Sequence, residues 1–130
     1  MTLPRLKTYA SDTGRIYEYY FVEKRTTARF GAAIEYVYNV SSDRRSVFPV
    51  SIFVLDEAVA DWAEHHGRPL NDSERYVAAR LALQRAFDEI EDLQHSGDPV
   101  TPSVLAFGPA GAELQVDAKR LEELLAPLDL

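Results

Sequence analysis

The chain has 130 residues, of which 46% are hydrophobic and 27% are charged, and its formal net charge is −7. These values are typical of one folded domain with a substantial core, and they exclude a disordered chain. The sequence contains no cysteine, which excludes disulfides, thiolate metal ligands and a cysteine nucleophile. No apolar run reaches the roughly 18 residues of a membrane span, and the first ten residues lack a signal-peptide core. We therefore expect a single cytoplasmic domain without membrane association.

The charge is distributed unevenly along the chain. Residues 1–50 contain eight Lys or Arg and five Asp or Glu, a net charge of +3, whereas residues 51–130 have a net charge of −10. A solvated acidic surface is the simplest explanation of the second half. The alternative is an acidic face that binds a basic partner.

In chain order, residues 1–14 show little periodicity and predict a loop or arm. The next three segments are rich in aromatic and β-branched residues and predict strands over 15–24, 29–40 and 46–55. The connections between them are short, so the strands should form an antiparallel meander. The first hairpin should turn near residues 26–27 through a wider, four-residue tip, because two threonines disfavour a type I′ turn.

Alternation of side chains predicts which strand faces are buried. Pairing Tyr38 with Phe48, and therefore Tyr36 with Val50, places the apolar sets of the second and third strands on one face. For the first hairpin, the corresponding prediction pairs Tyr19 with Ile34. That face should be the core. Aromatic residues there could also form a stacking platform for a ligand, but a helix-covered core is the simpler interpretation.

The opposite sheet face is unusual because it mixes polar with apolar groups. A solvated face should be mostly polar. Pro49 cannot donate a ladder hydrogen bond, which predicts that the third strand is an edge of the sheet at that position. We expect a cover on this face, either a second copy of the chain or the C-terminal segment with Leu105, Phe107, Leu121, Leu124 and Leu125. The candidate partner-binding residues are Tyr20, Val22, Val37 and Phe53.

The second half of the chain predicts helices. A short helix over 56–66 has Asp56 as its expected N-cap, and Gly67 and Pro69 after its end. A long amphipathic helix over 71–93 begins at an Asn71–Glu74 capping box and carries Phe87 on its apolar face. Segments 104–107 and 113–116 could form a small hairpin, and Asp117 could cap a last helix that ends before Pro127. The fold class is therefore α+β, with a meander packed against a long and a short helix.

Two constellations could carry chemistry. Asp61 and His65 share a helix face, with His66 beside them, and could hold a metal. A structural role at the end of the helix is the simpler interpretation, because the spacing suggests no third ligand. The predicted register also places Glu18 opposite Glu35, with Ser51 beside it. Such a pair could act as an acid/base couple or bind a hard cation, or both residues could simply face solvent.

Nucleic-acid binding requires a concentrated basic surface. Lys24, Arg25 and Arg29 belong to one predicted hairpin tip, whereas Arg44 and Arg45 belong to the other, and a meander separates these tips. No Walker, dinucleotide or G-x-S-x-G pattern is present. The sequence therefore predicts no catalytic, cofactor-binding or metal-binding residues.

Three hypotheses for the function remain open. The leading hypothesis is a non-enzymatic protein-interaction module, either a homo-oligomer or an acidic inhibitor or adaptor of a basic partner. The alternatives are a small enzyme or ligand-binding domain, with its pocket between sheet and helices, and a nucleic-acid binder that uses the hairpin tips. No residue pattern names a substrate or partner.

Overall fold

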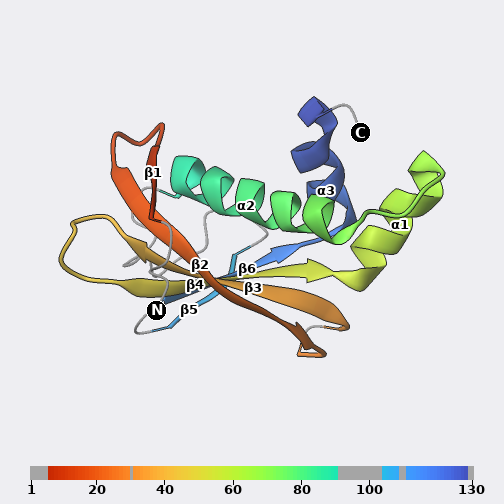
Figure 1. Ribbon diagram of the computed structural model, residues 1–130, viewed down its shortest axis with the longest axis horizontal. Coiled ribbons are helices and arrows are strands. Elements are labelled where there is room, and N and C mark those ends of the chain that lie inside the picture. Colours follow the sequence, from red (N-terminus) through yellow and green to blue (C-terminus); the bar gives the residue numbers. More distant parts are fainter. Residues whose placement is uncertain (1–5, 30, 91–103, 109–110, 129–130) are drawn as a thin grey trace.

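The computed structural model describes residues 6–29, 31–90, 104–108 and 111–128, which form a sheet with helices on one side (Figure 1). The strands are β1 (Lys7–Ala10), β2 (Ile16–Thr27), β3 (Ala33–Ser41), β4 (Phe48–Leu55), β5 (Val104–Gly108) and β6 (Gly111–Val116). The helices are α1 (Asp56–His66), α2 (Asp72–Glu89) and α3 (Ala118–Leu125), followed by a 3₁₀ turn over Ala126–Leu128. The predicted α+β class is confirmed.

The six strands form one sheet in the order β1-β2-β3-β4-β6-β5. All neighbours are antiparallel except β4 and β6, which pair in parallel over Val50–Val54 and Ala112–Val116. The predicted meander is therefore β2-β3-β4. The prediction of a loop over residues 1–14 was wrong for Lys7–Ala10, which pairs with the beginning of β2. The C-terminal hairpin exists and extends the same sheet.

The register between β3 and β4 differs from the prediction by two residues. Tyr38 pairs with Val50 and Tyr36 with Ile52, whereas Phe48 pairs with Val40. An even shift keeps each side chain on its face, so the predicted core face is correct. The physical reason for the shift is a longer connection between these strands, in which side chains of Ser41 and Asp43 bind backbone N–H groups.

The first hairpin departs further from the prediction. Tyr19 pairs with Val40 rather than with Ile34, and a β-bulge interrupts the ladder between Phe21 and Glu23. The connection between the strands lies after Thr27 instead of at Thr26–Thr27, and Gly31 in it has φ of 87°. A left-handed backbone there suits glycine. This longer β2 carries its arginines farther along the sheet than predicted.

At Pro49, strand β4 is paired on its β3 side but, among the described residues, not on its β6 side. Asn39 of β3 pairs with Pro49, but the pairing of β4 with β6 begins only at Val50. The predicted edge at Pro49 is therefore confirmed, whereas the rest of β4 lies inside the sheet. At Pro49 itself no described ladder partner lies on the β6 side, which suits a residue that cannot donate a hydrogen bond.

Helix α2 begins as predicted, at a complete capping box between Asn71 and Glu74. It ends at Glu89 rather than at residue 93, because Ile90 has an extended backbone. Its 18 residues span about 27 Å. Residues 91–93, including Leu93 of the predicted apolar face, lie outside the described residues. Arg75 joins α2 to the sheet by donating to the backbone oxygen of Val54 (3.0 Å) and pairing with Asp56.

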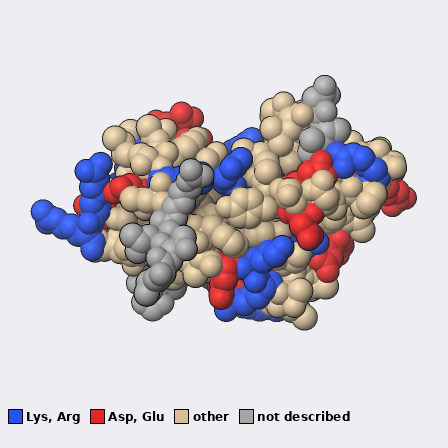
Figure 2. Space-filling view, in the orientation of Figure 1, with Lys and Arg blue, Asp and Glu red and all other residues tan. Residues whose placement is uncertain are grey.

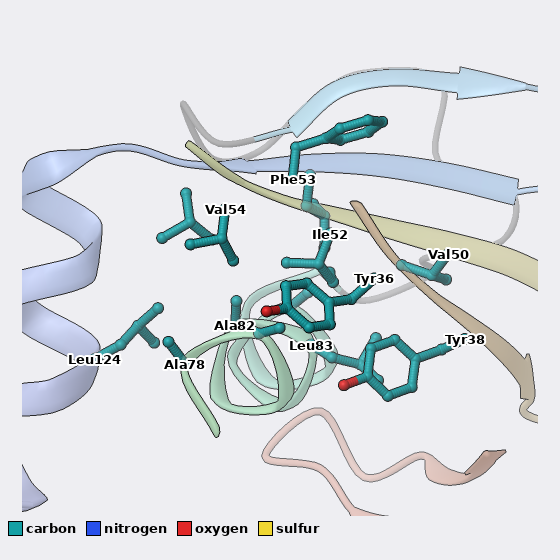
Figure 3. Packing of buried hydrophobic residues seen from close by; sticks show 14 of the residues in the cluster. Tyr36, Tyr38, Val50, Ile52, Phe53, Val54, Ala78, Ala82, Leu83 and Leu124 are labelled. Carbon is teal, nitrogen blue, oxygen red and sulfur yellow. The ribbon is translucent and has the colours of Figure 1, made fainter. Parts of the chain in front are cut away.

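The core lies between α2 and the aromatic face of the sheet. Tyr36 and Tyr38 point from β3 toward α2, where Ala82 and Leu83 meet them (Figure 3). The Phe87 ring stacks on Tyr17 of β2, with centroids 4.2 Å apart. Four alanines of α2 are buried, which lets the helix lie close to bulky side chains of the sheet. These alanines are Ala78, Ala79, Ala82 and Ala86.

The two shorter helices complete the same layer. Helix α1 lacks a side-chain cap, since Leu55 and not Asp56 is its N-cap, and it ends at Gly67 with φ of 74°. Helix α3 begins at Asp117, whose carboxylate accepts the Arg120 backbone N–H as predicted. It packs against α1 and α2. Leu121, Leu124 and Leu125 are therefore buried under the helices, and the expectation that they could cover the opposite sheet face was wrong.

Phe87 tests this packing, because its ring is fully buried among aromatic rings of β1 and β2. Phe87→Ala should lower the free energy of unfolding by about 3–5 kcal/mol, since a cavity replaces the ring. Urea denaturation followed by circular dichroism measures this loss. Leu128→Ala, at a largely exposed position, is the control and should change stability by less than about 0.5 kcal/mol. A loss below about 1 kcal/mol for Phe87→Ala would contradict the packing.

Candidate partner-binding face

The sheet face turned away from the helices, called the outer face below, is the candidate site. In the described strands it is formed by Glu18, Tyr20, Glu35, Val37, Asn39, Ser51, Phe53, Glu113 and Gln115. The register places three of the four predicted partner-binding residues there, and Val22 lies at the bulge of β2. Tyr20 and Val37 are half-buried and Val22 is 46% exposed, whereas Phe53 is only 1% exposed. The four residues therefore do not form one accessible patch.

The part of the outer face around Phe53 is closed by the chain itself. Glu35, opposite Phe53 in the register, is buried. Its carboxylate accepts hydrogen bonds from Arg25 Nε (2.8 Å) and Ser51 Oγ (2.7 Å). The hydrogen bond from Arg25 is the main reason that the pKa of Glu35 is lowered, and burial opposes it. Ser51 lies beside Glu35 as expected.

A second arginine crosses the same part of the sheet. Arg29 follows β2 in sequence but pairs with Glu113 of β6. Strands β3 and β4 lie between β2 and β6, so this ion pair links the connection after β2 to a strand that is not its neighbour in the sheet. Arg25 and Arg29, considered above for nucleic-acid binding, therefore neutralise acidic side chains of their own sheet.

Glu18 lies in a different part of the face from Glu35. It is opposite Ser41, and its carboxylate pairs with Arg44 Nε at 3.1 Å, whereas Glu35 is opposite Arg25. The predicted Glu18–Glu35 pair was wrong because the first hairpin has a different register. In the observed register, neither Glu18 nor Glu35 lies opposite another carboxylate, as the members of an acid/base couple would.

Beside Glu18, the outer face contains a hollow of about 170 Å³. Its lining combines apolar side chains with an ion pair and a hydrogen-bonded Tyr20–Asn39 pair (2.8 Å). Leu6 and Val47 at its margin are 56% and 59% exposed. The residues that line this outer hollow are Leu6, Glu18, Tyr20, Asn39, Val40, Ser41, Arg44 and Val47.

The β3–β4 loop fixes one wall of the outer hollow. Asp43 Oδ1 accepts the backbone N–H groups of Arg45 (2.8 Å) and Ser46 (2.9 Å), which lowers the pKa of Asp43. Ser41 Oγ accepts the Arg44 N–H at 2.9 Å. Arg44 has φ of 65°, a left-handed conformation that few residues with a Cβ adopt. The loop therefore holds Arg44 at the margin in a defined, strained backbone.

A second hollow of about 170 Å³ lies between β1, α2 and the end of α3. Tyr9 Oη donates to Asp88 Oδ2 there at 2.7 Å, and this hydrogen bond is the main reason that the pKa of Tyr9 is raised to about 12. The position corresponds to the pocket between sheet and helices in the ligand-binding alternative. Both hollows are smaller than the roughly 300–1,000 Å³ of typical small-molecule sites.

The predicted metal candidate is occupied by structural contacts. His65 Nδ1 lies 2.8 Å from the backbone oxygen of Asp61, and the pKa of His65 is raised mainly by this hydrogen bond. His66 stacks on Trp62 and reaches Glu122 of α3 at 2.9 Å. Across the described part of the chain, no cluster of three His, Asp or Glu residues could hold a metal ion. His66 therefore joins the end of α1 to α3, whereas His65 bonds within α1.

Sequence reasoning missed the outer hollow. Leu6 belongs to the predicted loop or arm, and Arg44 was considered only as part of a basic tip. The available signal was the Ser-Ser-Asp segment before Arg44, because Ser and Asp side chains bind backbone N–H groups in tight loops. That signal predicts a fixed loop, although it does not predict which side chains the loop approaches.

The charged surface is mixed. Figure 2 shows Lys and Arg side chains projecting at the end of the molecule where the β3–β4 loop lies, and acidic and basic groups interspersed elsewhere. The β2–β3 connection lies at the other end of the sheet (Figure 1). The two basic tips therefore do not merge into one surface. Within the described segments, no helix has the length and apolar character needed to cross a membrane.

Comparisons with known proteins yield no match for this chain among family models, curated proteins or solved structures.

Arg25 tests the closed part of that face, because Glu35 keeps a lowered pKa mainly through its hydrogen bond. A lowered folded-state pKa stabilises the fold above the unfolded pKa, and this contribution is lost as the pH falls. Arg25→Ala should therefore raise the pKa of Glu35 and lower the melting temperature near neutral pH, with a smaller difference in acid. Carboxyl NMR titration and thermal melts at several pH values measure both effects.

Arg45→Ala is the matched control, since Arg45 belongs to the other hairpin and its side chain has no contact with Glu35 in the structure. It should leave the Glu35 titration unchanged. An unchanged Glu35 pKa in Arg25→Ala would contradict the hydrogen-bonded closure of this part of the face.

Proposed function

We propose that this chain is a non-enzymatic protein-interaction module that binds its partner on the open part of the outer face. One observation supports this proposal. Apolar side chains are exposed on the open part of the outer face, although the core on the helical side of the sheet is fully packed. Leu6 and Val47, which both line the outer hollow, are 56% and 59% exposed. Grouped exposed apolar residues of this kind mark contact surfaces more often than they occur by chance.

The arrangement of charges favours binding over catalysis. Glu18, Glu35 and Glu113 of the outer face each pair with an arginine. For Glu35, the hydrogen bond from Arg25 lowers the pKa, so this carboxylate does not serve as a proton donor near neutral pH. The same pairs leave the face nearly neutral, which lowers the cost of bringing a second protein surface against it.

The two forms of the module hypothesis use different surfaces. A basic partner would favour the helical half of the chain, where the sequence has its net charge of −10. The nearly neutral outer face instead suits a second copy or a partner without excess positive charge. We propose the outer face as the principal surface, because its apolar side chains supply the area that association requires.

Val47 provides the test. Val47→Asp should weaken self-association, or capture of a partner by the immobilised chain, about tenfold or more, because contact would bury the new carboxylate. Its stability should change by less than about 0.5 kcal/mol, since Val47 is 59% exposed. Sedimentation over a concentration series measures self-association against the 14.6 kDa mass of one chain. Affinity capture with quantitative mass spectrometry measures binding of other proteins.

Leu128→Asp is the matched control, because Leu128 is 43% exposed but lies at the end of α3 on the helical side. It should leave association and capture unchanged. A chain that stays monomeric at all concentrations and captures the same proteins with and without Val47→Asp would refute the module. Equal weakening by both aspartates would refute the assignment to the outer face.

A further inference from the structure

The shape of the outer hollow limits what a partner could insert. Leu6 and Val47 supply apolar surface, and Tyr20 with Asn39 closes one side. The volume of about 170 Å³ admits a single apolar side chain and is too small for a cofactor. Deeply seated single side chains are the usual anchors of protein interfaces. The hollow therefore fits an anchor residue of a partner.

The ion pair at the margin of the outer hollow favours a negatively charged group next to the anchor residue. The Glu18 side chain is 19% exposed, whereas that of Arg44 is 80% exposed. The anion is thus turned toward the sheet and the cation toward solvent. Arg44 Nε is used by Glu18, but a guanidinium has five N–H donors, so its outward Nη groups can bind a carboxylate at the same time.

The backbone of the loop makes this cation a fixed element of the hollow. Ser41 and Asp43 hold the loop through hydrogen bonds to the backbone N–H groups of residues 44–46. Holding Arg44 at φ of 65° directs its side chain over Glu18. A fixed donor loses less conformational entropy when it binds than a mobile arginine does.

We propose that the outer hollow binds a protein segment whose anchor is an apolar side chain with a carboxylate next to it. This inference rests on the proposed function and adds the chemistry of the partner. The apolar side chain enters between Leu6 and Val47, and the carboxylate meets the outward N–H groups of Arg44. The ligand class is accordingly an apolar–acidic peptide segment.

The test uses N-acetylphenylalanine, which joins one apolar side chain to a carboxylate, and its uncharged amide as the matched probe. Titration of the full ¹⁵N-labelled chain should shift backbone amide signals at Leu6, Tyr20, Arg44 and Val47. The carboxylate probe should bind about two- to fivefold more tightly than the amide, as expected for one solvent-exposed ion pair. Raising the salt concentration should reduce this preference.

Arg44→Asn removes the guanidinium and keeps a residue type that tolerates a left-handed backbone. It should abolish the preference for the carboxylate while the amide still binds. Arg45→Asn, one residue along the same loop, is the control and should preserve the preference. A melting temperature close to that of the unmodified chain confirms that each loop variant remains folded.

Several results would overturn the inference. These are absence of shifts around the outer hollow, shifts located instead at the hollow beside Tyr9 and Asp88, and equal affinity for acid and amide. A preference that survives Arg44→Asn would also overturn it. If these results occur while Val47→Asp still weakens association, the proposed module stands and only its partner chemistry is wrong. If the probes bind as expected but Val47→Asp changes no association, the hollow is a ligand site and the module is wrong.

Discussion

The close packing of α2 on the tyrosine-rich face of the sheet is the contact on which the rest of the structure depends. Alanines at 78, 79, 82 and 86 bring the helix near the sheet, and Leu83 and Phe87 fill the space between aromatic rings. Hydrophobic burial is roughly proportional to the area removed from water, so this layer supplies most of the stabilisation. With α1 and α3 packed beside α2, all described helices lie on one side.

Because the described helices pack on one side of the sheet, they do not cover the outer face. Around Phe53, arginines from the long β2 hairpin neutralise Glu35 and Glu113, and little surface remains exposed. Around the outer hollow, Arg44 pairs with Glu18, and the apolar side chains of Leu6 and Val47 at the margin stay in contact with water. The two parts differ because Arg25 and Arg29 pair with carboxylates within the first part, whereas Arg44 pairs with Glu18 at the margin of the second. The proposed function follows from that difference.

The extent to which the sequence predicts this fold has a physical limit. Alternation of apolar and polar residues determines which face a side chain occupies, so the core position of Tyr36, Tyr38 and Ile52 was predictable. It does not determine a shift by an even number of residues, which preserves every face. The register of the second hairpin, and that of the first hairpin before its bulge, were wrong for this reason, and so was the Glu18–Glu35 pair. After the bulge the shift of the first hairpin is odd, which places Arg25 on the outer face. The capping box at Asn71 was predictable because it is local.

The candidate site was predictable only in part. Tyr20, Val37 and Phe53 were placed together on the correct face by alternation alone. The burial of Phe53 was not predictable, because Arg29 and the parallel strand β6 reach this region from distant parts of the sequence. The outer hollow likewise brings Leu6 of the N-terminal region to the β3–β4 loop. Contacts between distant segments leave no periodic pattern that a single sequence could reveal.

Hydroxyl-radical footprinting with mass spectrometry tests the central claim that one sheet face is sealed and the other is partly open. In the dilute chain, Leu6, Tyr20 and Val47 should be oxidised, whereas Tyr36, Tyr38, Phe53 and Phe87 should be protected. At high concentration, or with a partner present, the first group should become protected and the second should not change. Oxidation of Phe53 in the dilute chain, or protection of Leu6 and Val47 there, would contradict the account.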